Sequence, residues 1–298
     1  MAQVTPLRLL VLLVGITCGA SSVIFIRGSQ QDPILLVFYR TAIAVIALSP
    51  LFIYHYRRAD VTMRHYLRTT HLKNCLLPAA IFALHFVTWN MGARATAAAN
   101  ATLLVNLVPV AMVGVLWLLF RELPTRREML ATALAILGVL IVSVPAIELN
   151  PEHLIGNAFC LVSMVFFAFY LALAKRFSHL PSLWLYVVPL YALTGLMCLP
   201  FGLWRSDWLS FIDQTDVLMT LALGLVPTVF GHSILNRMMQ LMPGQTVSVI
   251  NTFQFVIAGL LAFWLWGEQP EPLFYLGSVS IVAALMILVL RRPGAKTR

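Results

Sequence analysis

The chain has 298 residues, of which 60% are hydrophobic and only 10% are charged, and this composition lies outside the range of soluble globular proteins. Its formal net charge of +9 does not indicate a nucleic-acid partner, because the basic residues are scattered in short loops between apolar runs and form no recognition helix. The chain is therefore expected to be an integral membrane protein surrounded by the lipid bilayer.

Ten apolar runs follow one another along the chain, and each is long enough to cross a hydrocarbon core of roughly 30 Å as a helix. We expect these spans near residues 7–26, 34–54, 73–92, 96–119, 127–146, 156–175, 183–204, 216–236, 244–266 and 272–290. The stretch from His55 to Lys73 is expected to be the only soluble loop of any length. The predicted fold class is an all-α integral membrane protein with ten transmembrane helices.

Part of the first half of the chain returns in the second half. The segment from His85 to Glu122 reads HFVTWNMGARATAAANATLLVNLVPVAMVGVLWLLFRE, and the segment from His232 to Glu268 reads HSILNRMMQLMPGQTVSVINTFQFVIAGLLAFWLWGE. Each contains a His, an Asn four or five residues later, a turn, a second apolar helix and a closing Glu. The sequence therefore predicts two five-helix repeats, at residues 7–146 and 156–291. Because five is odd, the second repeat is inverted in the membrane, and inverted repeats are typical of secondary transporters.

The charges of the loops indicate the orientation, because Lys and Arg concentrate in cytoplasmic loops. With both termini in the cytoplasm, all but four of the 20 Lys and Arg residues fall in cytoplasmic segments. Arg27, Arg94 and Arg205 lie outside, and Arg40 lies within a span. Most acidic residues fall on the opposite side from the basic ones. The sequence therefore predicts a multi-pass protein with both termini cytoplasmic.

Several motifs resemble those of the EamA-type transporters of the drug/metabolite transporter superfamily. They are PILLVFYR at Pro33–Arg40, NLVPV at Asn106–Val110, FRE at Phe120–Glu122, a fifth helix bearing Gly138, and WGE at Trp266–Glu268. The resemblance covers nearly the whole chain and implies a ten-helix exporter of metabolites in the inner membrane. It also implies a central cavity lined by the third, fourth, eighth and ninth helices, with the fifth and tenth helices at the periphery.

Arg40 lies within the second span, where a centred charge costs at least ~2.5 kcal/mol on insertion scales. In one interpretation the guanidinium faces the cavity and binds a substrate carboxylate through two hydrogen bonds. Alternatively, Arg40 snorkels outward or ties its helix to backbone carbonyls of a neighbour. The second interpretation is favoured by the presence of Arg at this position across a family with many different substrates.

Polar and aromatic residues in the spans are the other candidates for substrate binding. His85, Trp89 and Asn90 share roughly one helix face, and His232 and Asn236 repeat this arrangement. The full set of expected cavity residues is Arg40, His85, Trp89, Asn90, Asn100, Asn106, Tyr170, His232, Asn236, Asn251 and Gln254. The two His are also candidates for proton coupling, since imidazole changes its charge near neutral pH. Alternatively, such polar pairs hold helices together without a ligand, at about 0.6 kcal/mol per pair on average.

Several absences narrow the function. No Asp or Glu is expected inside a span, which disfavours a carboxylate proton relay and favours a zwitterionic or anionic substrate over a cationic one. The sequence contains no Walker loop, HExxH, GxSxG or dinucleotide fingerprint, and its four Cys lack metal-binding spacing. We therefore expect no enzymatic activity, no cofactor and no bound metal.

The predicted function is secondary transport by alternating access. The expected partner is a small-molecule substrate, with export of amino acids or related polar metabolites as the first choice, and a monomer is compatible with the sequence. One alternative is a non-transporting membrane scaffold or accessory subunit. A second alternative is a drug or nucleotide-sugar transporter of the same superfamily.

Overall fold

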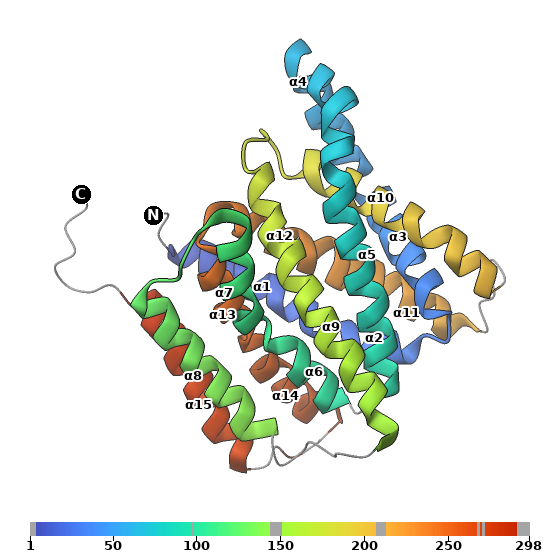
Figure 1. The fold of residues 1–298 in the computed structure, drawn as a ribbon. Helices are drawn as coiled ribbons and strands as arrows, with labels where there is room; N and C mark the ends of the chain where they lie inside the picture. Colours follow the sequence, from blue (N-terminus) through green and yellow to red (C-terminus); the bar gives the residue numbers. More distant parts are fainter. Residues whose placement is uncertain are drawn as a thin grey trace, which may run out of the picture.

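The computed structural model describes residues 4–96, 98–143, 151–206, 213–266, 269 and 272–290. It confirms the all-helical membrane fold (Figure 1), and no strand occurs in these ranges. Eight helical segments of the described residues are long and apolar enough to cross a membrane, and they are Pro6–Gly28, Pro33–Arg58, Val61–Ala95, Ala101–Phe120, His153–Phe177, Trp184–Arg205, Gln214–Leu241 and Pro272–Val289. The two remaining expected spans are also helical. One begins with three charged residues, and the other is divided into two shorter helices.

The helices of the described residues group into ten spans, five in each half. The first half contains α1 (Pro6–Ala20) with α2 (Ser22–Gly28), α3 (Pro33–Arg58), α4 (Val61–Tyr66) running through the π-helix η1 (Leu67–His71) into α5 (Leu72–Ala95), α6 (Ala98–Asn106) with α7 (Val108–Phe120), and α8 (Arg126–Ser143). The second half contains α9 (Pro151–Ala174) with η2 (Lys175–Phe177), α10 (Trp184–Arg205), α11 (Gln214–Leu223) running through the π-helix η3 (Gly224–His232) into α12 (Ser233–Leu241), α13 (Gly244–Asn251) with α14 (Phe253–Trp266), and α15 (Pro272–Val289).

The expectation of a loop between His55 and Lys73 is wrong, because most of this stretch is helical. The second span continues to Arg58, and α4 begins almost at once after it. The carboxylate of Asp60 caps α4 by accepting a hydrogen bond from the backbone N–H of Met63 at 2.6 Å, which satisfies one of the free amides of a helix start. Figure 1 shows α4 extending beyond the rest of the bundle.

Equivalent spans of the two repeats pack in matching pairs. The second spans of the repeats, α3 and α10, pack against each other, and so do the fifth spans, α8 and α15. The third span of the first repeat, α5, packs on the first span of the second repeat, α9. Conversely, the first span of the first repeat, α1, packs on the third span of the second repeat, at η3 and α12. This exchange of equivalent partners is the arrangement that two inverted repeats produce.

The fourth spans of the two repeats break at equivalent places. In the first half α6 ends at Asn106 and α7 begins at Val108, while in the second half α13 ends at Asn251 and α14 begins at Phe253. Pro109 lies at the start of α7 and cannot donate a backbone hydrogen bond to the preceding turn. The ninth span has no proline at this place, so the break does not depend on proline alone.

Close backbone contact joins α8 and α15, which lie side by side at one edge of the bundle (Figure 1). A Cβ atom added at Gly138 would lie 2.5 Å from the carbonyl oxygen of Gly277 and 2.8 Å from Cγ1 of Ile281. Membrane helices pack at such short range through small residues. The two glycines are therefore required for the contact between these helices.

We predict that Gly138→Ala destabilises the protein, because the added methyl group forces the two backbones apart at a cost of roughly 1–3 kcal/mol. Gly114→Ala is the matched control, since a Cβ at Gly114 in α7 meets no atom within 4 Å and alanine is the better helix former by roughly 0.5–1 kcal/mol. Thermal unfolding of the purified protein in detergent measures both effects. Equal unfolding temperatures for the two variants would contradict the close contact.

Candidate functional site

Arg40 occupies the centre of the bundle and is completely buried. Its Nε donates a hydrogen bond to the hydroxyl of Thr228 at 3.0 Å, and its guanidinium carbon lies 3.7 Å from the centre of the Phe86 ring. The two terminal nitrogens, Nη1 and Nη2, have no hydrogen-bond partner among the described residues. Arg40 therefore does not snorkel to the membrane surface, and within the described residues it binds no backbone carbonyl.

This environment leaves the charge of Arg40 without an opposite charge. No acidic side chain pairs with it in the part of the chain that the structure describes. The ring face of Phe86 offers a favourable cation–π contact, but it does not replace the hydrogen bonds that the terminal nitrogens would make in water. A buried cation with free donors is costly, and an anion placed against it would remove that cost.

The π-helix η3 holds the partner of Arg40. The hydroxyl of Thr228 donates to the carbonyl of Leu223, five residues earlier, at 2.8 Å, and the hydroxyl of Tyr191 donates to the carbonyl of Thr228 at 3.3 Å. Pro227 removes one backbone donor from the helix immediately before Thr228. Such π-helical segments occur frequently at functional sites. The widened turn places the Thr228 hydroxyl where Arg40 reaches it.

The two repeat-related histidines lie beside each other near Arg40. The centres of the His85 and His232 rings are 6.1 Å apart. His232 lies 4.9 Å from Phe86 and 5.0 Å from Phe82, and His85 stacks on Phe167 at 4.7 Å, all measured between ring centres. Helices α5, α9 and η3 thus enclose the imidazoles in an aromatic box.

The two imidazoles differ in their hydrogen bonds. Nδ1 of His85 lies 2.9 Å from the hydroxyl of Ser163 and 3.1 Å from its carbonyl oxygen, so α9 fixes that ring. Nδ1 of His232 has no hydrogen-bond partner among the described residues. The sequence repeat therefore places two histidines together, and they differ at Nδ1, which is bound to Ser163 in His85 and is without a partner among the described residues in His232.

Asn236 and Tyr170 complete this set of polar side chains. The amide Nδ2 of Asn236 donates to the hydroxyl of Tyr170 and, at 2.8 Å, to the carbonyl of His232. Its Oδ1 is buried without a partner among the described residues. We call Arg40, His85, Tyr170, His232 and Asn236 the central polar cluster. It offers free donors on Arg40, a free nitrogen on His232 and a free acceptor on Asn236.

The cluster is occluded from both sides of the membrane in this conformation. Its most exposed member, His232, has 8% of its surface accessible, and Arg40 has none. Its members come from the second, third, sixth and eighth spans, whereas the resemblance to the family implied a lining by the third, fourth, eighth and ninth. The fourth and ninth spans place no residue in the cluster.

Several predicted site residues lie outside the cluster. The indole Nε1 of Trp89 donates to the hydroxyl of Ser22 at 3.1 Å, and Nδ2 of Asn90 donates to the carbonyl of Pro33 at 2.8 Å. Both side chains therefore join α5 to its neighbours, as expected if these polar residues hold helices together without a ligand.

The amides of the fourth and ninth spans have other positions. Asn106 and Asn251 end α6 and α13 at the two equivalent breaks, and each has a buried Oδ1 without a partner among the described residues. The amide of Gln254 packs beside Gly19 of α1. The side chain of Asn100 lies outside the described residues.

The expectation that no acidic residue enters a span is wrong at two span ends. Asp216, only 1% exposed, accepts hydrogen bonds from the hydroxyl of Ser29 at 2.7 Å and from Nε2 of Gln31 at 2.6 Å. Glu128, 8% exposed, accepts one from the hydroxyl of Thr246 at 2.9 Å. Both carboxylates lie in the first turn of a helix, where the free amides favour a negative charge.

Asp216 belongs to a set of contacts that closes the end of the bundle around residues 29–32. Arg94 of α5 donates to the carbonyls of Ser29 and Gln31 at 2.8 and 2.6 Å. Asp32 pairs with Arg205 of α10 at 3.1 Å. Residues 29–32 are thus tied to α5, α10 and α11 at once. At the other end of the bundle, Lys175 pairs with Glu122.

Sequence reasoning missed Thr228, Ser163 and the phenylalanines of the aromatic box. Thr228 follows a proline in an apolar span, which is a weak signal of a distorted helix. The phenylalanines are indistinguishable in sequence from ordinary apolar residues of a membrane helix.

Comparisons with known proteins agree with this architecture. The sequence model of the EamA-like transporter family matches residues 7–144 and again residues 154–290. An uncharacterized transporter of Archaeoglobus fulgidus is 24% identical over 278 residues, which cover 93% of this chain and 94% of that protein. The uncharacterized transporter YdfC of Bacillus subtilis is 25% identical over 219 residues, which cover 70% of this chain and 68% of that protein.

A solved structure shares the fold. A crystal structure described only as that of a protein superimposes with a TM-score of 0.76 at 14% sequence identity, and the match covers 94% of this chain and 95% of the other.

We predict that Thr228→Val destabilises the protein, because it leaves Nε of the buried Arg40 without its acceptor at a cost of about 1–3 kcal/mol. Thr17→Val is the control, since the Thr17 hydroxyl is exposed and donates only to the carbonyl of Leu13 in its own helix. The measurement is thermal unfolding in detergent. If both variants unfold at the same temperature as the unchanged protein, the hydrogen bond between Arg40 and Thr228 is not part of the native structure.

Proposed function

The chain belongs to the EamA-like transporter family, and from this premise we propose that it exports small polar metabolites by alternating access, with amino acids or related zwitterionic or anionic compounds as substrates. It is a membrane transporter with several apolar spans. The proposal includes its place in the inner membrane with both termini in the cytoplasm, and its division into repeats at residues 7–146 and 156–291.

One observation supports the substrate class most directly. The terminal nitrogens of Arg40 are buried without hydrogen-bond partners among the described residues, so a planar pair of donors is left unsatisfied inside the bundle. A carboxylate is the group that matches such a donor pair in both geometry and charge. The free acceptor of Asn236 and the free nitrogen of His232 would contact the polar remainder of the substrate, including an ammonium group.

Alternating access requires that the cluster open to one side at a time. Residues 29–32 connect the first and second spans, and they contact Arg94 of the third span, Arg205 of the seventh and Asp216 of the eighth. These contacts at one end of the bundle are hydrogen bonds and one ion pair. Such contacts can separate and reform without exposing a large apolar surface. In the proposed mechanism this end opens to release substrate, and the opposite end opens to admit it.

His232 is the better of the two candidates for proton coupling. Its Nδ1 is free among the described residues, whereas His85 is held by Ser163. A proton on His232 would place a second positive charge in the cluster that contains Arg40. Proton binding and substrate release would then affect each other through charge repulsion, which is the reciprocal relation that coupling requires.

We predict that Arg40→Met abolishes export while the protein remains folded. The loss of a charged hydrogen-bonding pair, about 1.5–3 kcal/mol, corresponds to at least a ten-fold loss of transport at limiting substrate. Methionine removes a buried charge that lacks an opposite charge, so the unfolding temperature is expected to stay the same or to rise. Release of amino acids from loaded cells measures transport, and Arg64→Gln, far out on α4, is the control.

Two outcomes would count against the role of Arg40. Unchanged export by Arg40→Met would show that the guanidinium does not bind substrate. Loss of both export and folding would show a structural role. If no metabolite of a broad panel is released from cells that contain the folded, unchanged protein, the scaffold or accessory alternative replaces transport.

We predict that His232→Gln removes the dependence of export on a proton gradient and leaves gradient-independent exchange in place, because glutamine retains a polar group but does not titrate. The measurement compares export with and without a collapsed gradient. His65→Gln, exposed on α4, is the control and is expected to behave as the unchanged protein. A gradient dependence that persists in His232→Gln would exclude this residue as the coupling site.

A further inference from the structure

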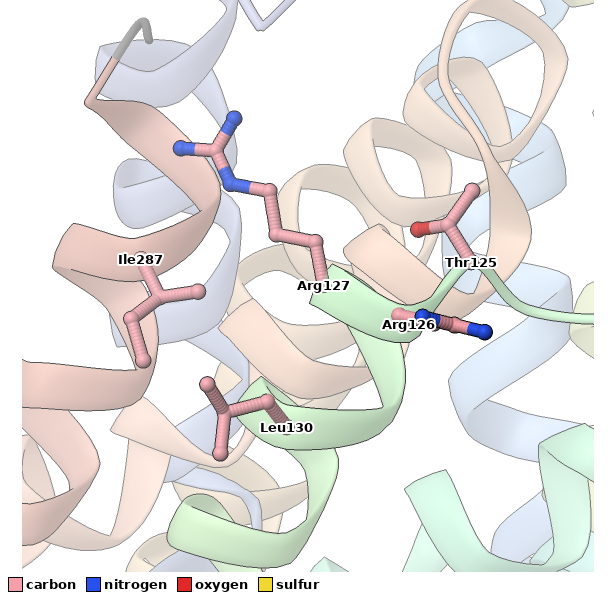
Figure 2. Close-up of a pocket in the computed structure, with 5 residues that line it drawn as sticks. All are labelled: Thr125, Arg126, Arg127, Leu130 and Ile287. Atoms are coloured by element: carbon pink, nitrogen blue, oxygen red, sulfur yellow. The ribbon is translucent and has the colours of Figure 1, made fainter.

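A groove lies between the ends of α8 and α15, and none of its lining residues belongs to the central polar cluster. It has a volume of about 620 Å³ and is lined by Thr125, Arg126, Arg127, Leu130 and Ile287. Figure 2 shows Arg126 and Arg127 at the first turn of α8, with the side chain of Arg127 extended on the side of α15. Neither arginine has a part in the proposed transport mechanism.

The charge of this groove is positive and is not neutralised by its acidic neighbour. Arg126 and Arg127 are both exposed. Glu128 is buried, and its carboxylate accepts hydrogen bonds from Thr125 and from Thr246 of α13. Guanidinium groups with free N–H donors are well suited to a phosphate group. Figure 2 shows that Arg126 and Arg127 extend to different sides of the start of α8, with Arg127 on the side of α15.

The position of Arg127 is fixed across the groove. One of its terminal nitrogens donates to the carbonyl of Leu290, at the end of α15. This bond satisfies one of the free carbonyls of a helix end and joins α15 to α8. The remaining N–H groups of Arg127 stay available for a further contact on the side of α15.

Polarity changes along the groove in one direction. Leu130 lies one helical turn below Arg126 on α8, and Ile287 lies nearly one turn below Leu290 on α15. The charged groups are thus at the ends of the helices and the apolar groups are closer to the middle of the membrane. A phospholipid has the same order, with its phosphate at the interface and its acyl chains deeper. A soluble phosphate compound has no apolar group that would contact Leu130 and Ile287.

We propose that this groove binds one anionic phospholipid of the cytoplasmic leaflet, with the phosphate against Arg127, the second positive charge of Arg126 at the same helix end, and an acyl chain along Leu130 and Ile287. In the topology proposed above, these helix ends are cytoplasmic, where basic residues beside the membrane attract anionic lipids. The bound lipid would bridge α8 and α15 and stabilise the peripheral pair that the glycine contact holds together.

The test uses the delipidated, full-length protein in detergent. Phosphatidylglycerol, phosphatidylcholine with the same acyl chains, and soluble glycerol 3-phosphate are added separately, and native mass spectrometry and thermal unfolding report binding. Phosphatidylglycerol is expected to bind and to raise the unfolding temperature, while the other two have little effect. The double variant Arg126→Gln and Arg127→Gln is expected to bind at least ten-fold less of it and to lose one bound lipid.

Two further variants make the result specific. Arg64→Gln with Lys73→Gln removes the same charge from the cytoplasmic part of α4 and α5, and it is expected to bind phosphatidylglycerol as the unchanged protein does. Arg126→Gln alone leaves the hydrogen bond between Arg127 and Leu290 in place. A loss of lipid binding in this variant therefore cannot come from separation of α8 and α15. Unchanged binding in the double variant, or equal stabilisation by glycerol 3-phosphate or phosphatidylcholine, would overturn the proposal.

Discussion

The buried guanidinium of Arg40 is the constraint around which the centre of this protein is arranged. A positive charge without an opposite charge is unfavourable in a membrane protein interior, and yet among the described residues Arg40 has a threonine hydroxyl as its hydrogen-bond partner and an aromatic ring against its guanidinium, but no acidic side chain. The distortion of η3, the hydrogen bond from Tyr191 and the enclosure by aromatic rings all serve to hold Arg40 in this position. In the proposed function, the unsatisfied donors are the means by which an anion is selected.

The inverted repeat explains why the other polar residues converge on the same place. His85 and His232 occupy related positions in the two halves, and the exchange of helix partners between the halves brings their rings to 6.1 Å. The halves differ where Arg40 has no basic counterpart and where Ser163 binds only one of the histidines. A symmetric scaffold thus carries an asymmetric polar cluster, which the proposed binding of a substrate with two different ends requires.

Much of this arrangement was predictable from sequence, and the failures have identifiable causes. The apolar runs predicted the spans, and the repeat predicted that His85 and His232 are related. Thr228 could not be predicted, because its contact with Arg40 joins residues 188 positions apart across a π-helix that has no simple sequence signature. Asp216 and Glu128 looked like interfacial charges, but side-chain hydroxyls and amides of neighbouring segments allow both to be buried.

The most direct test of the account is whether binding depends on a carboxylate and on Arg40 together. An amino acid that the export panel identifies is compared with its methyl ester, and each is added to the purified protein and to Arg40→Met while thermal unfolding is followed. The account predicts that only the free amino acid raises the unfolding temperature, and only when Arg40 is present. Equal stabilisation by the ester, or stabilisation that survives in Arg40→Met, would contradict the assignment of Arg40 as the anion-binding group.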